Sequence, residues 1–158
     1  MNHIIELILI TFAPIFELRG SIPYGILKLG MNWLSVFIIA VLANIAVGVI
    51  VFLLLDWLVR VFCRFKFVKR LYDRLIARTQ KNVEKYIDKW GELGLAIFIG
   101  IPLPGSGVWT GALAAYILGF KFRKFLIANI IGVLIAAVIV TILVLTGSEV
   151  FSIFVKRV

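Results

Sequence analysis

The sequence predicts an all-α integral membrane protein, and three features support this prediction. The chain of 158 residues is 63% hydrophobic, and its mean hydropathy is +1.11, which is more apolar surface than a soluble domain of this size can bury. Two long apolar stretches, 33–59 and 125–146, are long enough to span a bilayer. Two others are interrupted by proline and glycine, at 13–23 and 100–107. We predict an inverted repeat, in which each half is a re-entrant helical hairpin followed by a transmembrane helix.

The first apolar stretch, about 3–27, does not suit a straight lipid-facing helix. Pro14 and Pro23 lack the backbone donor that a continuous helix needs. Glu17 and Arg19 would lie near the bilayer centre, where each charge costs about 2.5–3.5 kcal/mol on insertion scales. Irregular backbone at membrane depth is tolerated where protein or water covers it. We therefore expect a helix, a break and a second helix, followed by a turn at 29–32.

The two transmembrane helices carry small and polar residues that suit helix packing. In 33–59, no charge occurs before Asp56, and Asn44 and Gly48 lie among alanines. In 125–146, Asn129 and Gly132 lie near the start. We expect both asparagines to form hydrogen bonds between helices.

The segment 60–90 is a basic amphipathic helix by its pattern. It holds 10 of the 17 lysines and arginines, interleaved with apolar residues at helical spacing. We expect it to lie on the cytoplasmic surface against anionic lipid head groups. The alternatives are that it packs on a partner subunit, or that it is a solvated linker that only sets topology. The net charge of +9 is explained by this loop, so we expect no nucleic-acid binding.

The second broken stretch repeats the plan of the first. Residues 91–119 contain the sequence Pro-Leu-Pro-Gly-Ser-Gly at 102–107, through which no helix continues. If both broken stretches enter and leave on one side, Lys121, Arg123 and Lys124 join the basic loop, which places 13 of the 17 basic residues in the cytoplasm. Both termini are then extracytoplasmic. The halves have opposite orientations, as in transporters whose site lies at the midplane.

The chain is thus expected to be a single integral membrane domain, residues 1–158. Its parts are repeat one at 3–59, the linker at 60–90, repeat two at 91–148 and a tail at 149–158.

The site residues are expected at the two breaks. Glu17 is predicted to be a proton-coupling carboxylate and Arg19 a phosphate anchor, because its planar fork suits a phosphate head group. The alternative for this pair is a structural ion pair. Half-helices beginning after Gly20 and Gly105 would point positive dipole ends at an anion. The hydroxyl groups that could bind substrate, or else cap these helices, belong to Ser21, Ser106 and Thr110. The residues that make the breaks are Pro14, Pro23, Pro102 and Pro104.

Enzymatic chemistry is not expected. The chain has one cysteine, Cys63, and one histidine, His3, which leaves no thiolate cluster or histidine set for a metal. No nucleophile–base pair or nucleotide-binding loop is visible either. We expect no cofactor, and we expect a homodimer or higher oligomer because four short segments make a thin wall around a cavity.

Two motifs resemble a known family. The stretch Pro14-x-x-Glu-Leu-Arg-Gly-Ser-Ile-Pro23 and the stretch Pro102-Leu-Pro-Gly-Ser-Gly-x-Trp-Thr-Gly111 are similar to those of the small multidrug export proteins of prokaryotes. That resemblance implies a location in the cytoplasmic membrane. More distantly, the plan is similar to the DedA family, whose facing re-entrant hairpins are implicated in moving lipid-linked phosphates. DedA proteins carry arginines in the second hairpin, whereas positions 98–120 hold no charge here.

Three functions follow as hypotheses. The first is a transporter or flippase for a small anionic or lipid-linked phosphate substrate, driven by protons. The second is a proton-coupled exporter of cationic drugs. The third is a membrane scaffold without transport.

Overall fold

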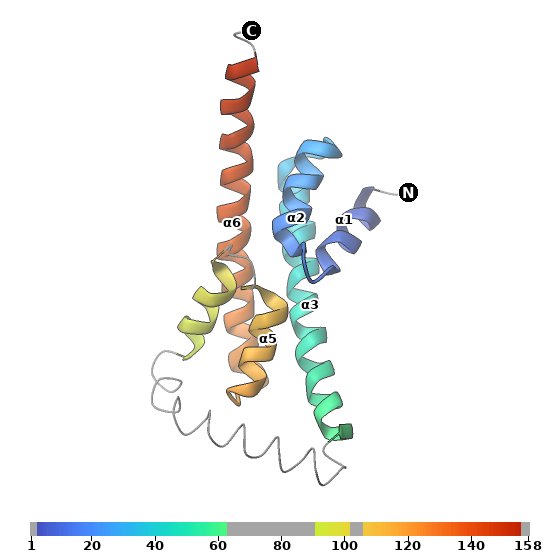
Figure 1. Ribbon diagram of the computed structural model, residues 1–158, viewed down its shortest axis with the longest axis vertical. Helices are drawn as coiled ribbons and strands as arrows, with labels where there is room; N and C mark the ends of the chain where they lie inside the picture. The colour runs from blue at the N-terminus through green and yellow to red at the C-terminus, as the bar shows by residue number, and fades with distance from the viewer. Residues whose placement is uncertain (1–2, 63–90, 102–105, 156–158) are drawn as a thin grey trace.

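The structure is a computed structural model that describes residues 3–62, 91–101 and 106–155, and within these ranges it is helical without strands (Figure 1). The elements in chain order are α1 (His3–Phe12), α2 (Glu17–Pro23), the π-helix η1 (Tyr24–Lys28), α3 (Trp33–Phe62), a helical segment Gly91–Gly100, α5 (Val108–Ile117) and α6 (Phe122–Val155). The all-helical prediction is confirmed for this part of the chain. Most of the predicted linker, 63–90, lies outside the described residues.

The helices α3 and α6 lie along the long axis of the molecule, and they run in opposite directions (Figure 1). Trp33–Leu55 of α3 and Phe122–Gly147 of α6 are long and apolar enough to cross a membrane. At 1.5 Å per residue, each of these stretches extends at least about 30 Å, the thickness of a hydrocarbon core. The two predicted long apolar helices are therefore present as candidate membrane spans, with α6 beginning three residues earlier than expected.

The core lies where α3 and α6 meet the shorter helices. Small and branched buried side chains such as Ala40, Val47, Ala128 and Val133 line it, with the buried Phe125 stacked on Phe52 at a centroid distance of 4.5 Å. On the outer faces of α3 and α6, leucine and isoleucine side chains remain exposed. Such an apolar exterior is unfavourable in water and natural in lipid.

The first broken stretch forms a hairpin of two helices, as predicted. α1 ends at Phe12, ahead of Pro14, and the chain turns through 13–16. α1 and α2 then pack against each other, and the buried hydroxyls of Thr11 and Ser21 lie 2.8 Å apart across this contact. Farther along the hairpin, the Tyr24 hydroxyl donates to the Glu6 carboxylate.

The position of the break differs from the prediction. Gly20 and Ser21 were expected to precede a half-helix, but both lie inside α2, which begins at Glu17. Gly20 serves close packing instead, because a Cβ at that position would lie 2.8 Å from the Cβ of Phe16. A break at Pro14 alone is enough to reverse the chain.

Pro23 also departs from its predicted role. Its backbone stays helical, with φ −61° and ψ −37°. The chain continues as the π-helix η1, in which the Leu29 N–H donates to the Tyr24 carbonyl at 3.1 Å. The wider turn accommodates the ring without ending the helix. Pro23 therefore changes the type of helix, and the chain turns only at Gly30, whose φ is +62°.

The second broken stretch also places two helices together. The segment Gly91–Gly100 contacts α5, since a Cβ on Gly111 would lie 2.5 Å from Cγ1 of Ile99. The same segment rests on α6 at Gly132, where a Cβ would lie 2.7 Å from the Ala96 carbonyl oxygen. Pro102, Pro104 and Gly105, three of the predicted break residues, lie outside the described residues.

We predict that Gly132→Ala destabilises the fold by about 1–3 kcal/mol, the usual cost of overpacking a core. The obstructing atom is a backbone carbonyl and cannot move aside cheaply. Thermal unfolding in detergent, followed by circular dichroism, measures the effect. Gly147→Ala in the same helix is the control, because nothing lies within 4 Å of its Cβ. An equal loss of stability in both variants would contradict the packing described for Gly132.

Candidate functional site

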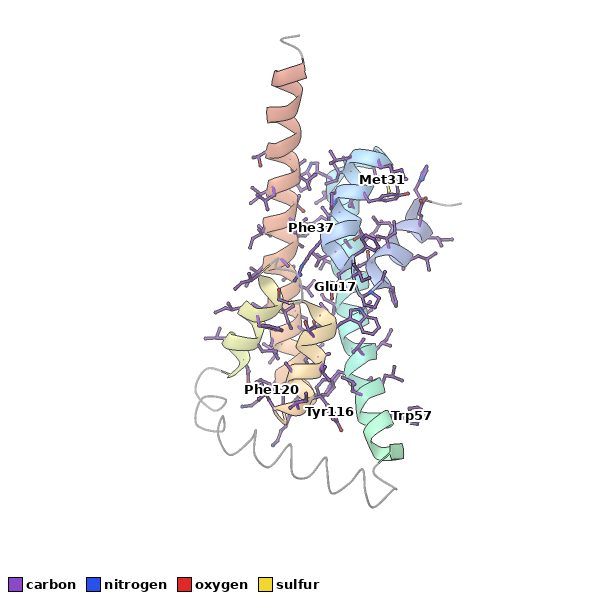
Figure 2. All side chains as sticks on the ribbon, viewed as in Figure 1. Glu17, Met31, Phe37, Trp57, Tyr116 and Phe120 are labelled. Carbon is purple, nitrogen blue, oxygen red and sulfur yellow. The ribbon has the colours of Figure 1, made fainter. Side chains whose placement is uncertain are left out.

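Glu17 is the residue at which the two hairpins meet. It is the first residue of α2 and is 5% exposed, and it lies midway along the molecule (Figure 2). Its carboxylate accepts a hydrogen bond from the backbone N–H of Trp109 at 3.3 Å. Trp109 is the second residue of α5, so the Glu17 side chain binds the first turn of α5.

The backbone of Glu17 is in an unfavourable conformation. Its φ is +47°, and it is the only residue other than glycine with a positive φ in the described ranges. A conformation of this kind costs on the order of 1–3 kcal/mol and persists where the surroundings hold it. Here the contact with α5 holds it, since the carboxylate meets the N-terminal end of that helix, where the dipole is positive.

Gly107 makes this contact possible. A Cβ at position 107 would lie 2.5 Å from Oε2 of Glu17, so any other residue would force the carboxylate to shift. Its φ of +153° is also one that glycine adopts readily. The residue was part of the predicted break, but its role in seating Glu17 was missed. In the sequence, the only indication of this role was that Gly107 is the last glycine before an apolar helix.

Arg19 of α2 forms hydrogen bonds with residues that follow the helical segment Gly91–Gly100. One guanidinium nitrogen, Nη2, donates to the Ile101 carbonyl and to the Ser106 hydroxyl, both at 3.2 Å. The Ser106 hydroxyl itself donates to the Ile101 carbonyl at 2.6 Å. Glu17, Arg19 and Ser106, three of the predicted site residues, are therefore gathered at one place.

The other predicted site residues lie apart from this group or use their polar atoms locally. Ser21 is fully buried and bonded to Thr11 on the α1 side of α2. The Thr110 hydroxyl donates to the Gly107 carbonyl at 3.3 Å, within the first turn of its own helix.

Several buried polar atoms have no hydrogen-bond partner among the described residues. They are Nε1 of Trp109, Oδ1 of Asn44, Oδ1 of Asn129 and Oγ1 of Thr141. Asn129 lies close to the start of α5, because a Cβ on Gly48 would be 2.5 Å from its Nδ2 and 2.7 Å from Cγ1 of Val108. The sequence indicated both asparagines as helix-packing residues, and their nearness to the hairpins was not foreseen.

A set of at least three histidine, cysteine, aspartate or glutamate side chains that could hold a metal is not found in the described ranges. The groups assembled at the hairpin tips are instead a carboxylate, a guanidinium, a hydroxyl and a helix N-terminus. Such a combination can bind an anion through Arg19 and the backbone, and can hold a proton on Glu17.

The fold and site are those of an all-helical protein with two candidate membrane-spanning helices and a buried carboxylate between broken helices. A family model described as "Putative small multi-drug export protein" matches residues 17–139, so the chain belongs to the small multi-drug export protein family. The match begins at Glu17, the first residue of α2, and extends into α6. No curated protein and no solved structure matches the chain. The similarity to the DedA family stays a prediction.

We predict that Gly107→Ala costs about 1–3 kcal/mol of stability, and less when Glu17 is already alanine. The reason is that the added methyl group collides with the Glu17 carboxylate, which the second substitution removes. Thermal unfolding of the two single variants and the double variant measures the coupling. Gly30→Ala is the control, since its φ of +62° strains any side chain while nothing lies within 4 Å of its Cβ. Equal costs of Gly107→Ala in both backgrounds would refute the contact.

Proposed function

We propose that the protein is a membrane transporter or flippase whose site lies at the midplane, between two facing re-entrant hairpins. The observation that carries this proposal is the hydrogen bond between the Glu17 carboxylate and the first turn of α5. It joins two broken helices at a place with several buried polar groups. Broken helices that meet at the midplane are typical of transporter sites.

The course of the chain supports re-entrant hairpins. α1 and η1 lie toward the end of the molecule where α3 begins, and the turn between α1 and α2 lies near the middle (Figure 1). The segment Gly91–Gly100 begins, and α5 ends, toward the opposite end of the molecule, where α6 begins. Each hairpin thus enters and leaves at one end of the molecule, and the two enter from opposite ends.

The spacing of residues supports an inverted repeat. Four pairs of like residues are each separated by 85 positions, namely Gly20 and Gly105, Ser21 and Ser106, Tyr24 and Trp109, and Asn44 and Asn129. The same offset relates α3 to α6 approximately, and it moves α2 with η1 onto positions 102–113, which include the first part of α5. α2 packs on both α3 and α6, and α5 does the same. Exchanging the two repeats therefore exchanges the contact of α2 and α3 with that of α5 and α6, and the contact of α2 and α6 with that of α5 and α3.

The proposed substrate is a small anion or a lipid-linked phosphate. Arg19 offers a planar guanidinium suited to a phosphate, and the N–H groups at the start of α5 favour negative charge. Glu17 now occupies that start, so protonation of its carboxylate would release the helix end to the substrate. This exchange is how we propose that transport is coupled to protons.

The family description favours a second candidate, proton-coupled export of cationic drugs. Glu17, a carboxylate that is 5% exposed, would then exchange a proton for the cation. Against this candidate, Arg19 belongs to the same site and would repel a cation. A scaffold without transport is the third candidate, and it would not depend on either side chain.

The proposal includes the orientation of the protein in the membrane and its oligomeric state. The basic residues of 60–90, with Lys121, Arg123 and Lys124, would face the cytoplasm of a prokaryotic cell and bind anionic head groups. Both termini would be extracytoplasmic. A homodimer or higher oligomer would seal the outer wall of the site.

We predict that Arg19→Ala reduces lipid-phosphate transport at least about tenfold, because loss of a hydrogen bond to a charged group costs on the order of 1.5–3 kcal/mol. The assay uses purified protein in liposomes that contain a fluorescent polyprenyl phosphate, with quenching from outside. Lys28→Ala is the matched control, since it removes an equal charge from an exposed position.

The outcomes separate the three functions. Loss of transport in Arg19→Ala, with normal transport in Lys28→Ala, supports the proposal. Efflux of ethidium from loaded liposomes that survives Arg19→Ala but is lost in Glu17→Gln would favour the cation exporter. If neither probe moves faster with protein than without it, the transport proposal is wrong.

A further inference from the structure

Asn44 and Asn129 occupy equivalent places in the two repeats but make different contacts. Both are in the contact between α3 and α6, and they are 1% and 0% exposed. Asn129 donates through Nδ2 to the carbonyl of Ile45 on α3 at 3.3 Å. The Oδ1 atoms of both asparagines have no hydrogen-bond partner among the described residues, so the difference between them is the bond that Nδ2 of Asn129 donates.

The repeat supplies an alternative bond. A shift of 85 positions converts Asn129 into Asn44 and Ile45 into Ile130. The bond from Asn129 to the Ile45 carbonyl therefore has a counterpart, from Asn44 to the carbonyl of Ile130 on α6. This counterpart is not among the hydrogen bonds found in the described residues. Transporters built from inverted repeats alternate between two states by moving one repeat against the other, and such an exchange gives each repeat the conformation of its partner.

We propose that Asn44 and Asn129 are a pair of positioning residues that hold the two transport states in turn. The state described here is held by Asn129 on the Ile45 carbonyl. The opposite state is held by Asn44 on the Ile130 carbonyl, while Asn129 is released. This inference rests on the inverted repeat of the proposed function.

The close packing at Gly48 fits a movable contact. A Cβ at this position would lie 2.5 Å from Nδ2 of Asn129. The position equivalent to Gly48 in the second repeat is Val133, which is fully buried. The two states are thus equivalent in their hydrogen bonds and unequal in packing, so one of them is favoured at rest.

Two buried positions report the exchange. Val51 on α3 and Ala136 on α6 are separated by 85 positions and are 6% and 2% exposed. Each follows its asparagine by seven residues, and because α3 and α6 run in opposite directions (Figure 1), the two positions lie on opposite sides of the bond between Asn129 and Ile45. We expect each to become accessible when the molecule opens toward its own side.

The experiment measures the rates at which N-ethylmaleimide labels single cysteines at positions 51 and 136, in full-length protein with Cys63→Ser. Asn129→Ala should shift the ratio of the two rates by about fivefold, the effect of one net hydrogen bond on an equilibrium. Asn44→Ala should shift the ratio by a similar factor in the opposite direction. The double variant should return it toward the parent value.

Thr141→Val is the matched control, because it removes a buried hydroxyl that has no partner in the described ranges while keeping the shape. It should leave the ratio unchanged. Shifts in the same direction for the two asparagine variants, or no shift in either, would overturn the inference. If a single variant does not fold, the double variant and Asn44→Leu test the same shift.

The result is independent of the substrate. Normal liposome transport that depends on Arg19, with an unchanged labelling ratio, would refute the role of the asparagines alone. Opposite shifts in a protein that moves none of the probes would support the exchange and refute the proposed substrates.

Discussion

The whole arrangement depends on one buried carboxylate in a chain that is otherwise apolar. Glu17 cannot face lipid without a large cost, so the first hairpin must place it against donors. Those donors are the N–H groups at the start of α5, with Trp109 at 3.3 Å. Meeting this requirement accounts for the positive φ of Glu17 and for the glycine at position 107. A charge that would oppose insertion thereby becomes the contact that joins the two halves.

Arg19 makes the same place useful for binding. Its guanidinium donates to Ile101 and Ser106, so its charge is held near the second break by hydrogen bonds. A substrate anion would compete with these acceptors and with the Glu17 carboxylate. The competition suggests why two opposite charges lie two residues apart in α2. In the proposed function both charges are needed, because Arg19 binds the anion and Glu17 takes up and releases the proton.

Much of the fold could be predicted from local features, and much of the site could not. Long apolar stretches predict α3 and α6, and Pro14 predicts the first reversal, because these signals act within a few residues. Gly20 was misplaced because a glycine can serve either a turn or close packing, and only its contact with Phe16 decides between them. The meeting of Glu17 with Gly107 joins residues ninety positions apart, which no local pattern reveals. The 85-residue offset is present in the sequence, but its meaning depends on the packing of α2 and α5.

The most direct test of the central claim is the side of the membrane to which each connection is exposed. Single cysteines at positions 30, 80 and 122, in a chain with Cys63 replaced, would be probed in intact cells with a membrane-impermeant thiol reagent. Two re-entrant hairpins predict that position 30 is labelled and that positions 80 and 122 are both protected until the cells are opened. If position 122 is labelled in intact cells while position 80 is protected, the second broken stretch crosses the membrane. The facing hairpins and their shared site would then be wrong.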